Sequence, residues 1–153
     1  MSAYARDKGD VNIAFQLPLY PMLDDRMTTD SMKDNDAPIW SEKSNRAAWQ
    51  LYLGDTFGTD EVSPYAAPAR LTDYTKLPPT YTFVGDIEPF YDEVVAYISH
   101  LKAAGVIADI DIYKGAFHSF DSTVSKSPEA IDATEKMIEH YRYAASHYFA
   151  PQA

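Results

Sequence analysis

Residues 80–120, TYTFVGDIEPFYDEVVAYISHLKAAGVIADIDIYKGAFHSF, predict a strand, a helix and a second strand. The apolar run TYTFVG is typical of a strand buried on both faces. The run from IEPFYDE to AAG favours a helix, with Pro89 in its first turn and Gly105 beyond its end. IADIDIYK alternates, and Asp109 and Asp111 on its outer face indicate a strand near a sheet edge. This order implies two parallel strands joined by a crossover helix.

The residues before this unit extend the pattern. Residues 1–8 predict the last turns of a helix ending at Gly9, and the alternating run VNIAFQLPL, residues 11–19, predicts a strand. A short helix is expected from a cap at Ser41 or Ser44 to Gly54. Its apolar face is expected to contain Ala47, Ala48 and Leu51.

The last helix is expected to start near Pro128. Apolar residues recur along it at intervals of three and four and predict a buried stripe: Ile131, Thr134, Ile138, Tyr141, Ala145 and Tyr148. Strands alternating with helices indicate an α/β fold of about three parallel strands with flanking helices, within one domain over residues 1–153.

The composition excludes several classes of protein. The chain has 46% hydrophobic residues, enough for a core, and a formal net charge of −10, which argues against nucleic acid or an anionic membrane as partner. It contains no cysteine, so disulfides and thiolate chemistry are absent. No signal peptide and no membrane-spanning run is recognisable, and a cytoplasmic protein is expected.

Chemistry-bearing side chains follow both strands of the central unit. Asp86 and Glu88 come after the first strand, and His118 follows the second. Parallel α/β sheets build their sites at the carboxyl ends of strands, so these side chains are expected to lie together. A carboxylate beside a histidine fixes the ring tautomer and stabilises the imidazolium, and acid followed by histidine is the second half of a Ser…Asp/Glu…His order.

Several ordered motifs, namely ARDKG, LPLYPMLDD, WQLYLGD, VSPYAAPARL, VGDIEPFYDE and GAFHSF, give the chain a family resemblance. It resembles the C-terminal portion of an α/β-hydrolase of the hormone-sensitive-lipase-like carboxylesterase family. The resemblance implies that Glu88 is the triad acid, where Asp is more frequent, and that His118 is the general base. Asp92, and Asp86 beside the acid, take supporting positions. Ser119 stands where glycine is common.

The large departure from the family lies upstream of these motifs. Members carry an HGGG-type oxyanion loop and a G-x-S-x-G nucleophile elbow, and residues 1–153 contain neither. The resemblance therefore implies a fragment that contains two of the three triad members, Glu88 and His118. Ester hydrolysis needs the nucleophile and the oxyanion donors, so we expect this chain alone to be inactive toward the short-chain esters of the family.

The same residues are compatible with other roles. Glu88 can serve only to complement a helix dipole, Asp86 can be the acid in its place, and the chain can be a non-catalytic module for assembly or binding. A water-based hydrolase using Glu88 and His118 lacks an oxyanion hole. Trp40 and three further aromatic residues, Trp49, Tyr52 and Tyr65, can line a pocket or belong to the core.

The same resemblance predicts association. Without the strand that precedes it in the family, the strand at residues 11–19 would be an open edge beside uncovered apolar surface. We therefore expect a homo-oligomer or pairing with the N-terminal half, and the edge strand ADIDIY, where family members often dimerise, is a second contact. The acidic loop of residues 24–36 lacks the spacing of a calcium loop, and no metal or cofactor is expected.

Overall fold

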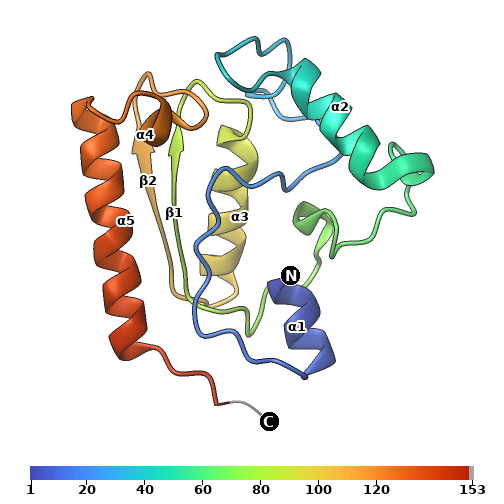
Figure 1. The fold of residues 1–153 in the computed structure, drawn as a ribbon. Coiled ribbons are helices and arrows are strands. Elements are labelled where there is room, and N and C mark those ends of the chain that lie inside the picture. Colours follow the sequence, from blue (N-terminus) through green and yellow to red (C-terminus); the bar gives the residue numbers. More distant parts are fainter. Residues whose placement is uncertain (152–153) are drawn as a thin grey trace.

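The computed structural model describes residues 1–151 and has the predicted strand–helix–strand unit at its centre (Figure 1). Strand β1 (Thr80–Gly85) leads into helix α3 (Tyr91–Ala103), which returns the chain to strand β2 (Ala108–Tyr113). The strands are parallel, with Thr80 opposite Ala108 and Gly85 opposite Tyr113. Every residue of β1 is buried, whereas the middle of β2 is partly exposed. The α/β fold and the edge character of β2 are thus confirmed.

Two helices cover the two faces of this sheet. Helix α3 lies on one side, and helix α5 (Pro128–His147) lies on the other (Figure 1). On the α3 side, Val94, Ile98 and Leu101 pack into a core that continues under the N-terminal segments. On the α5 side, the core consists of aromatic rings and small residues: Tyr81, Phe83, Tyr113, Ala116, Phe120, Ala130 and Ala133.

The remaining elements are short. Helix α1 (Ser2–Lys8) ends at Gly9 in the left-handed conformation, as its sequence predicts. Helix α2 (Glu42–Leu53) is capped by Ser41, whose hydroxyl accepts a hydrogen bond from the Ser44 amide. Two 3₁₀ turns, η1 (Gly54–Thr56) and η2 (Pro68–Arg70), and helix α4 (Phe120–Thr123) complete the set, and α4 was not expected.

The third strand predicted at residues 11–19 does not form. Only Gln16 pairs with β1: its amide donates to the Pro79 carbonyl at 2.9 Å and its carbonyl accepts from the Tyr81 amide at 3.2 Å. Within residues 1–151, the regular sheet therefore has two strands instead of about three. A ladder needs a partner along its length, and Pro18 removes one donor from this segment.

The predicted apolar faces of two helices are also wrong. On α5, Ala130, Ala133 and Ala144 are buried, while Ile131 and Tyr141 are 47% and 62% exposed. Small residues face the sheet because its aromatic rings fill the space between helix and strands. On α2 the buried residues are Asn45 and Trp49, and Leu51 is exposed.

Buried carboxylates fasten the irregular N-terminal segments to the core. Asp25 forms a bidentate ion pair with Arg70, at 2.6 and 2.8 Å, that joins residues far apart in the sequence. Glu93 of α3 accepts hydrogen bonds from the amides of Leu23 and Asp24, at 3.3 and 3.0 Å. These contacts give segments with little regular structure a defined position.

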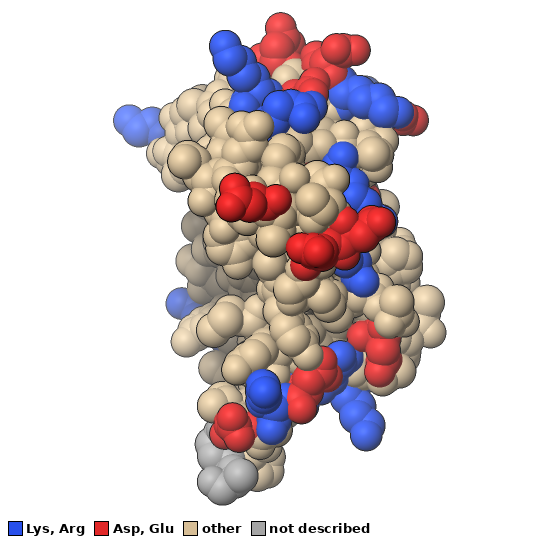
Figure 2. All heavy atoms as spheres, turned by 90° about the vertical axis from the view of Figure 1, so that its right-hand side faces the viewer, with Lys and Arg blue, Asp and Glu red and all other residues tan. Residues whose placement is uncertain are grey.

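Acidic and basic side chains are interspersed on the face shown in Figure 2. Arg46 pairs with Glu42 at 2.8 Å, and Lys33 pairs with Asp30 at 3.1 Å. No basic patch of the kind that binds nucleic acid is visible on this face. Among residues 1–151, no helix combines the length and the apolar character needed to cross a membrane.

Candidate active site

The loops after β1 and β2 are joined directly to each other. The Asp86 amide donates to the Tyr113 carbonyl at 3.1 Å, and the Asp86 carboxylate accepts from the Gly115 amide at 2.6 Å. The Ile87 amide donates to the Ala116 carbonyl at 3.4 Å. The end of one parallel strand is thus hydrogen-bonded to the loop after the next, which places their side chains at one edge of the sheet.

Gly85 makes this close approach possible. A Cβ atom at this position would lie 2.0 Å from the Ala116 carbonyl oxygen, far inside van der Waals contact. The oxygen is a backbone atom and the Cβ would be bonded directly to the backbone. Neither could move away without displacing the end of a strand. The glycine before the acid loop is therefore required by the packing of one loop on the other.

Glu88 and His118 face each other above this junction. The distance from His118 Nδ1 to Glu88 Oε2 is 3.3 Å, with the carboxylate side chain 0% exposed and the imidazole 13% exposed. The pair is within ion-pair distance but lacks the alignment of a hydrogen bond. Among residues 1–151, neither carboxylate oxygen has a hydrogen-bond partner.

Burial dominates the electrostatics of Glu88. Loss of solvation raises the pKa of its carboxyl group, and the neighbouring His118 opposes that rise by favouring the charged form. A carboxylate in such a place depends on a positive partner for its stability. It would stabilise an imidazolium at His118 more strongly than an exposed carboxylate would.

Three aromatic rings surround the imidazole. Its centroid lies 4.6 Å from Tyr20, 5.5 Å from Trp40 and 5.5 Å from Phe90, and the Trp40 ring is stacked. Tyr20 and Phe90 were not predicted as neighbours of His118. Phe90 follows the acid closely in the sequence, but nothing local in the chain places Tyr20 or Trp40 here, since both come from irregular segments.

The two residues predicted to support the pair form hydrogen bonds with the backbone of other segments. Asp86 accepts the Gly115 amide, as described above. Asp92, at the start of α3, accepts the Ser31 amide at 2.7 Å, and its own amide donates to the Ser31 hydroxyl at 3.1 Å. Asp92 thereby fixes the position of Ser31, in the segment that continues to Trp40. Since Trp40 stacks on His118, Asp92 influences the site indirectly.

A second buried carboxylate lies nearby on α3. Burial raises the pKa of Glu93 to about 8, partly offset by hydrogen bonds from the Leu23 and Asp24 amides. The Glu88 and Asp24 charges add to the rise. Local sequence around Glu93, in the first turn of α3, indicates only a role in complementing the helix dipole. Its burial depends on residues 23–24, which are distant in the chain.

A separate apolar cavity of about 580 Å³ lies between α1, α2 and the segments near residues 16–23 and 64–71. Trp49, Tyr52 and Tyr65 line it, whereas Trp40 does not. Neither Glu88 nor His118 borders this cavity. Of the four aromatic residues singled out from the sequence, three therefore line this cavity and Trp40 packs on His118.

Comparison with known proteins supplies a family for this arrangement. Residues 1–122 match the model of a family described as alpha/beta hydrolase fold. The chain is 32% identical to Esterase LipI of Mycobacterium tuberculosis (strain ATCC 25618 / H37Rv) over 133 residues, which is 86% of this chain and 41% of that protein.

Solved structures agree with this match. A bacterial heroin esterase superposes with a TM-score of 0.90 at 35% identity, over 94% of this chain and 46% of its own. An esterase from the bacterial hormone-sensitive lipase family superposes with a TM-score of 0.81 at 28% identity, over 94% of this chain and 48% of its own. The chain thus spans less than half the length of these relatives.

Proposed function

Because the chain belongs to the alpha/beta hydrolase fold family, among its hormone-sensitive-lipase-like carboxylesterases, we propose that it supplies the acid and the base of an ester hydrolase. In this proposal residues 1–153 are part of a single hydrolase domain, Glu88 is the acid and His118 is the general base. The substrates are short-chain carboxylic esters. A cytoplasmic location stays a prediction.

The contact between Glu88 and His118 carries this proposal. Nothing in the local sequence requires a fully buried carboxylate 3.3 Å from an imidazole, and such a pair is costly to maintain without a use. Asp86, the competing candidate for the acid, instead accepts a hydrogen bond from the Gly115 amide. This difference supports Glu88 over Asp86 as the acid.

The geometry suggests how the pair would work. Since Nδ1 of His118 faces Glu88, Nε2 is the ring nitrogen left to take a proton from a nucleophile. The imidazolium formed in that step would be stabilised by the buried carboxylate. The same Nε2–H would then return the proton to the departing alcohol oxygen.

The nucleophile and the oxyanion donors would come from outside residues 1–153, which contain no G-x-S-x-G sequence. We therefore propose that the chain by itself does not hydrolyse esters at a significant rate. Hydrolysis of a short-chain nitrophenyl ester by the purified chain, compared with the His118→Ala variant, tests this. A rate well above the variant's would reveal a nucleophile within residues 1–153 and refute the proposal.

Reconstitution tests the positive part of the proposal. The part of Esterase LipI that does not align with this chain would be co-expressed with the chain. Ester hydrolysis by the mixture would then be measured. Activity should appear in the mixture, and Glu88→Gln and His118→Ala should each lower it by about 10³-fold or more. Asp86→Asn is the matched control, and a larger loss there than in Glu88→Gln would make Asp86 the acid.

A second candidate, an assembly module without catalysis, is favoured by the apolar edge beside β1. Val11 and Leu19 are 53% and 38% exposed, and Gln16 provides the only ladder contact between this segment and β1 within residues 1–151. We propose that this edge pairs with the portion of a hydrolase that residues 1–153 do not cover, and that it self-associates without that portion. A monodisperse monomer in dilute solution, measured by light scattering, would exclude self-association.

A further inference from the structure

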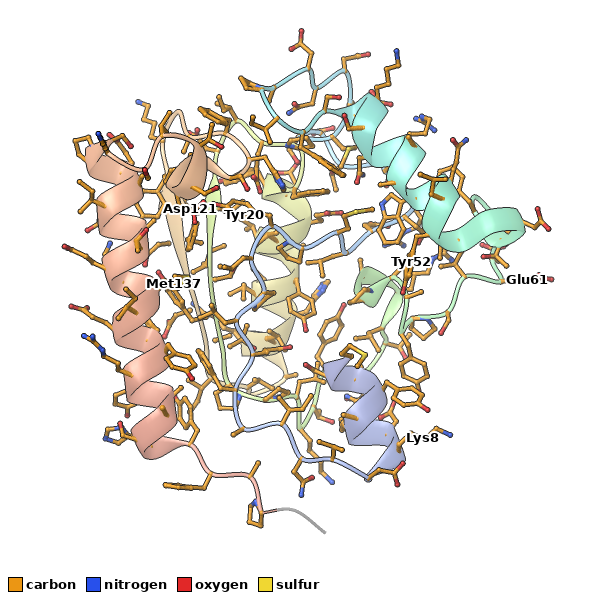
Figure 3. All side chains as sticks on the ribbon, in the orientation of Figure 1. Lys8, Tyr20, Tyr52, Glu61, Asp121 and Met137 are labelled. Atoms are coloured by element: carbon orange, nitrogen blue, oxygen red, sulfur yellow. The ribbon has the colours of Figure 1, made fainter. Side chains whose placement is uncertain are left out.

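Tyr20 connects the imidazole to the helix that follows it. The Tyr20 ring lies 4.6 Å from the His118 ring, centroid to centroid, with the planes inclined at 54°. The Tyr20 hydroxyl donates a hydrogen bond to the Asp121 carboxylate, in the first turn of α4 and three residues after the histidine. Figure 3 shows Tyr20 and Asp121 together at the upper end of the sheet.

The backbone is strained at Tyr20 and at the residue directly after His118. Tyr20 has a φ of 50° and Ser119, next to the histidine, has a φ of 60°, in the left-handed region that disfavours residues other than glycine. Such conformations persist where surrounding contacts determine them. For Tyr20, these contacts are the hydrogen bond to Asp121 and an edge-to-face contact with the buried Phe83 ring at 5.6 Å.

The imidazole needs such support because its polar contact is weak. His118 Nδ1 faces Glu88 without an aligned hydrogen bond, so ring packing must hold its orientation. Among the rings packed on the imidazole, Phe90 has no polar side-chain group. The indole N–H of Trp40 donates to Asn45, which lies in α2, at 3.4 Å. Tyr20 is the neighbour whose polar group is hydrogen-bonded to the segment directly after the histidine, at Asp121 in the first turn of α4.

We propose that Tyr20 is a positioning residue for His118, and that its hydrogen bond to Asp121 sets the orientation in which the imidazole faces Glu88. Tyr20 acts through packing and does not exchange a proton with substrate. The importance of this orientation for catalysis rests on the proposed function.

The first experiment is NMR of the whole chain with labelled histidine, at one fixed pH. Tyr20→Phe keeps the ring and removes the hydroxyl, and we expect the His118 ring signals to shift or broaden. Tyr113→Phe is the matched control, because it removes a similar phenol–carboxylate bond, to Asp132 at 2.7 Å, from a ring without a contact to His118. Unchanged His118 signals in a folded Tyr20→Phe variant would overturn the proposal.

Variants of the acceptor identify the cause. Asp121→Asn retains a carbonyl oxygen that can accept from Tyr20 and should give near-wild-type His118 signals. Asp121→Ala should reproduce the effect of Tyr20→Phe, and the double variant should differ little from either single one. Two fully additive effects would mean that the residues act separately, which contradicts the proposal.

The reconstituted enzyme provides the catalytic test. Tyr20→Phe should lower kcat about 10-fold with little change in KM, since a misoriented base slows proton transfer more than it weakens binding. Equal kcat values for Tyr20→Phe and wild type would refute the catalytic part. If every reconstituted mixture is inactive, the proposed function fails while the NMR result on Tyr20 still decides the geometric claim.

Discussion

Strand β1 and residues 11–19 have similar apolar sequences and lie next to each other, yet only β1 is a strand. β1 pairs with β2 over six residues and is buried on both faces by α3 and α5. Residues 11–19 form a single ladder bridge to β1, at Gln16, and expose Val11 and Leu19. An apolar pattern therefore becomes a strand when hydrogen-bonding partners and covering layers are both present.

The candidate site draws on both regions in different ways. The acid and the base follow β1 and β2, whose ends are hydrogen-bonded to each other. The rings of Tyr20 and Trp40 come from the irregular region and reach the imidazole across space. The regular unit thus brings the two chemical groups together, and the irregular one surrounds the imidazole.

Hydrogen exchange should give the largest contrast between the two regions. We expect the β1 amides that pair with β2 to exchange only by global unfolding, and amides of residues 13–17 other than Gln16 to exchange at least about 10³-fold faster. Exchange measured residue by residue by NMR tests this. Equal protection in both regions would mean that residues 11–19 are paired along their length in solution.

Replacing Gly85 by alanine should break the regular unit. Its Cβ would lie 2.0 Å from the Ala116 carbonyl oxygen, and we expect a loss of about 3 kcal/mol or more in the free energy of unfolding, measured with urea. Gly58→Ala is the control in the irregular region, where a Cβ meets nothing within 4 Å and only the φ of +79° is unfavourable. Its cost should be about 1 kcal/mol. Equal losses for both variants would contradict the close-packing argument.

Raising the pH should loosen the contact between the two regions. The pKa of Glu93 is raised to about 8 in the folded chain, so the folded state binds more protons than the unfolded state between the ordinary carboxyl pKa and that value. The stability contribution is complete below the ordinary pKa and is lost as the pH rises through about 8.

We therefore expect the free energy of unfolding to fall by about 4 kcal/mol between about pH 5 and about pH 9. Urea unfolding across this range measures it. Glu93→Gln should flatten most of the slope, leaving a remainder from Glu88, whose pKa burial also raises. An unchanged slope in the variant would assign the dependence to other groups.

The smallest expected effect concerns the residue after the histidine. Ser119 has a φ of 60°, and Ser119→Gly should stabilise the chain by about 1 kcal/mol because glycine adopts this conformation without strain. Ser127→Gly is the opposite case: Ser127 has a φ of −71° and caps α5 by accepting the Ala130 amide, so the same change should destabilise slightly. Thermal unfolding of both variants measures the two signs.

Much of the regular unit was predictable from local pattern. The bounds of β1 and β2, the crossover helix and the meeting of two strand-end loops all follow from apolar runs, alternation and the geometry of parallel strands. The glycine common at the Ser119 position has its reason in the left-handed backbone found there. The face of α5 was not predictable, because the sheet it covers is lined by aromatic rings that admit alanine in place of the larger residues.

Neighbours in the chain are enough to predict the α/β class, the order of the central elements, and Glu88 and His118 as candidate site residues. Three features are visible only in the folded chain: residues 11–19 form a single bridge, Glu93 is buried, and Tyr20 and Trp40 lie against the imidazole. These outcomes depend on contacts between segments distant in sequence. Such contacts are set by the space and the hydrogen-bonding groups that the packed sheet leaves available.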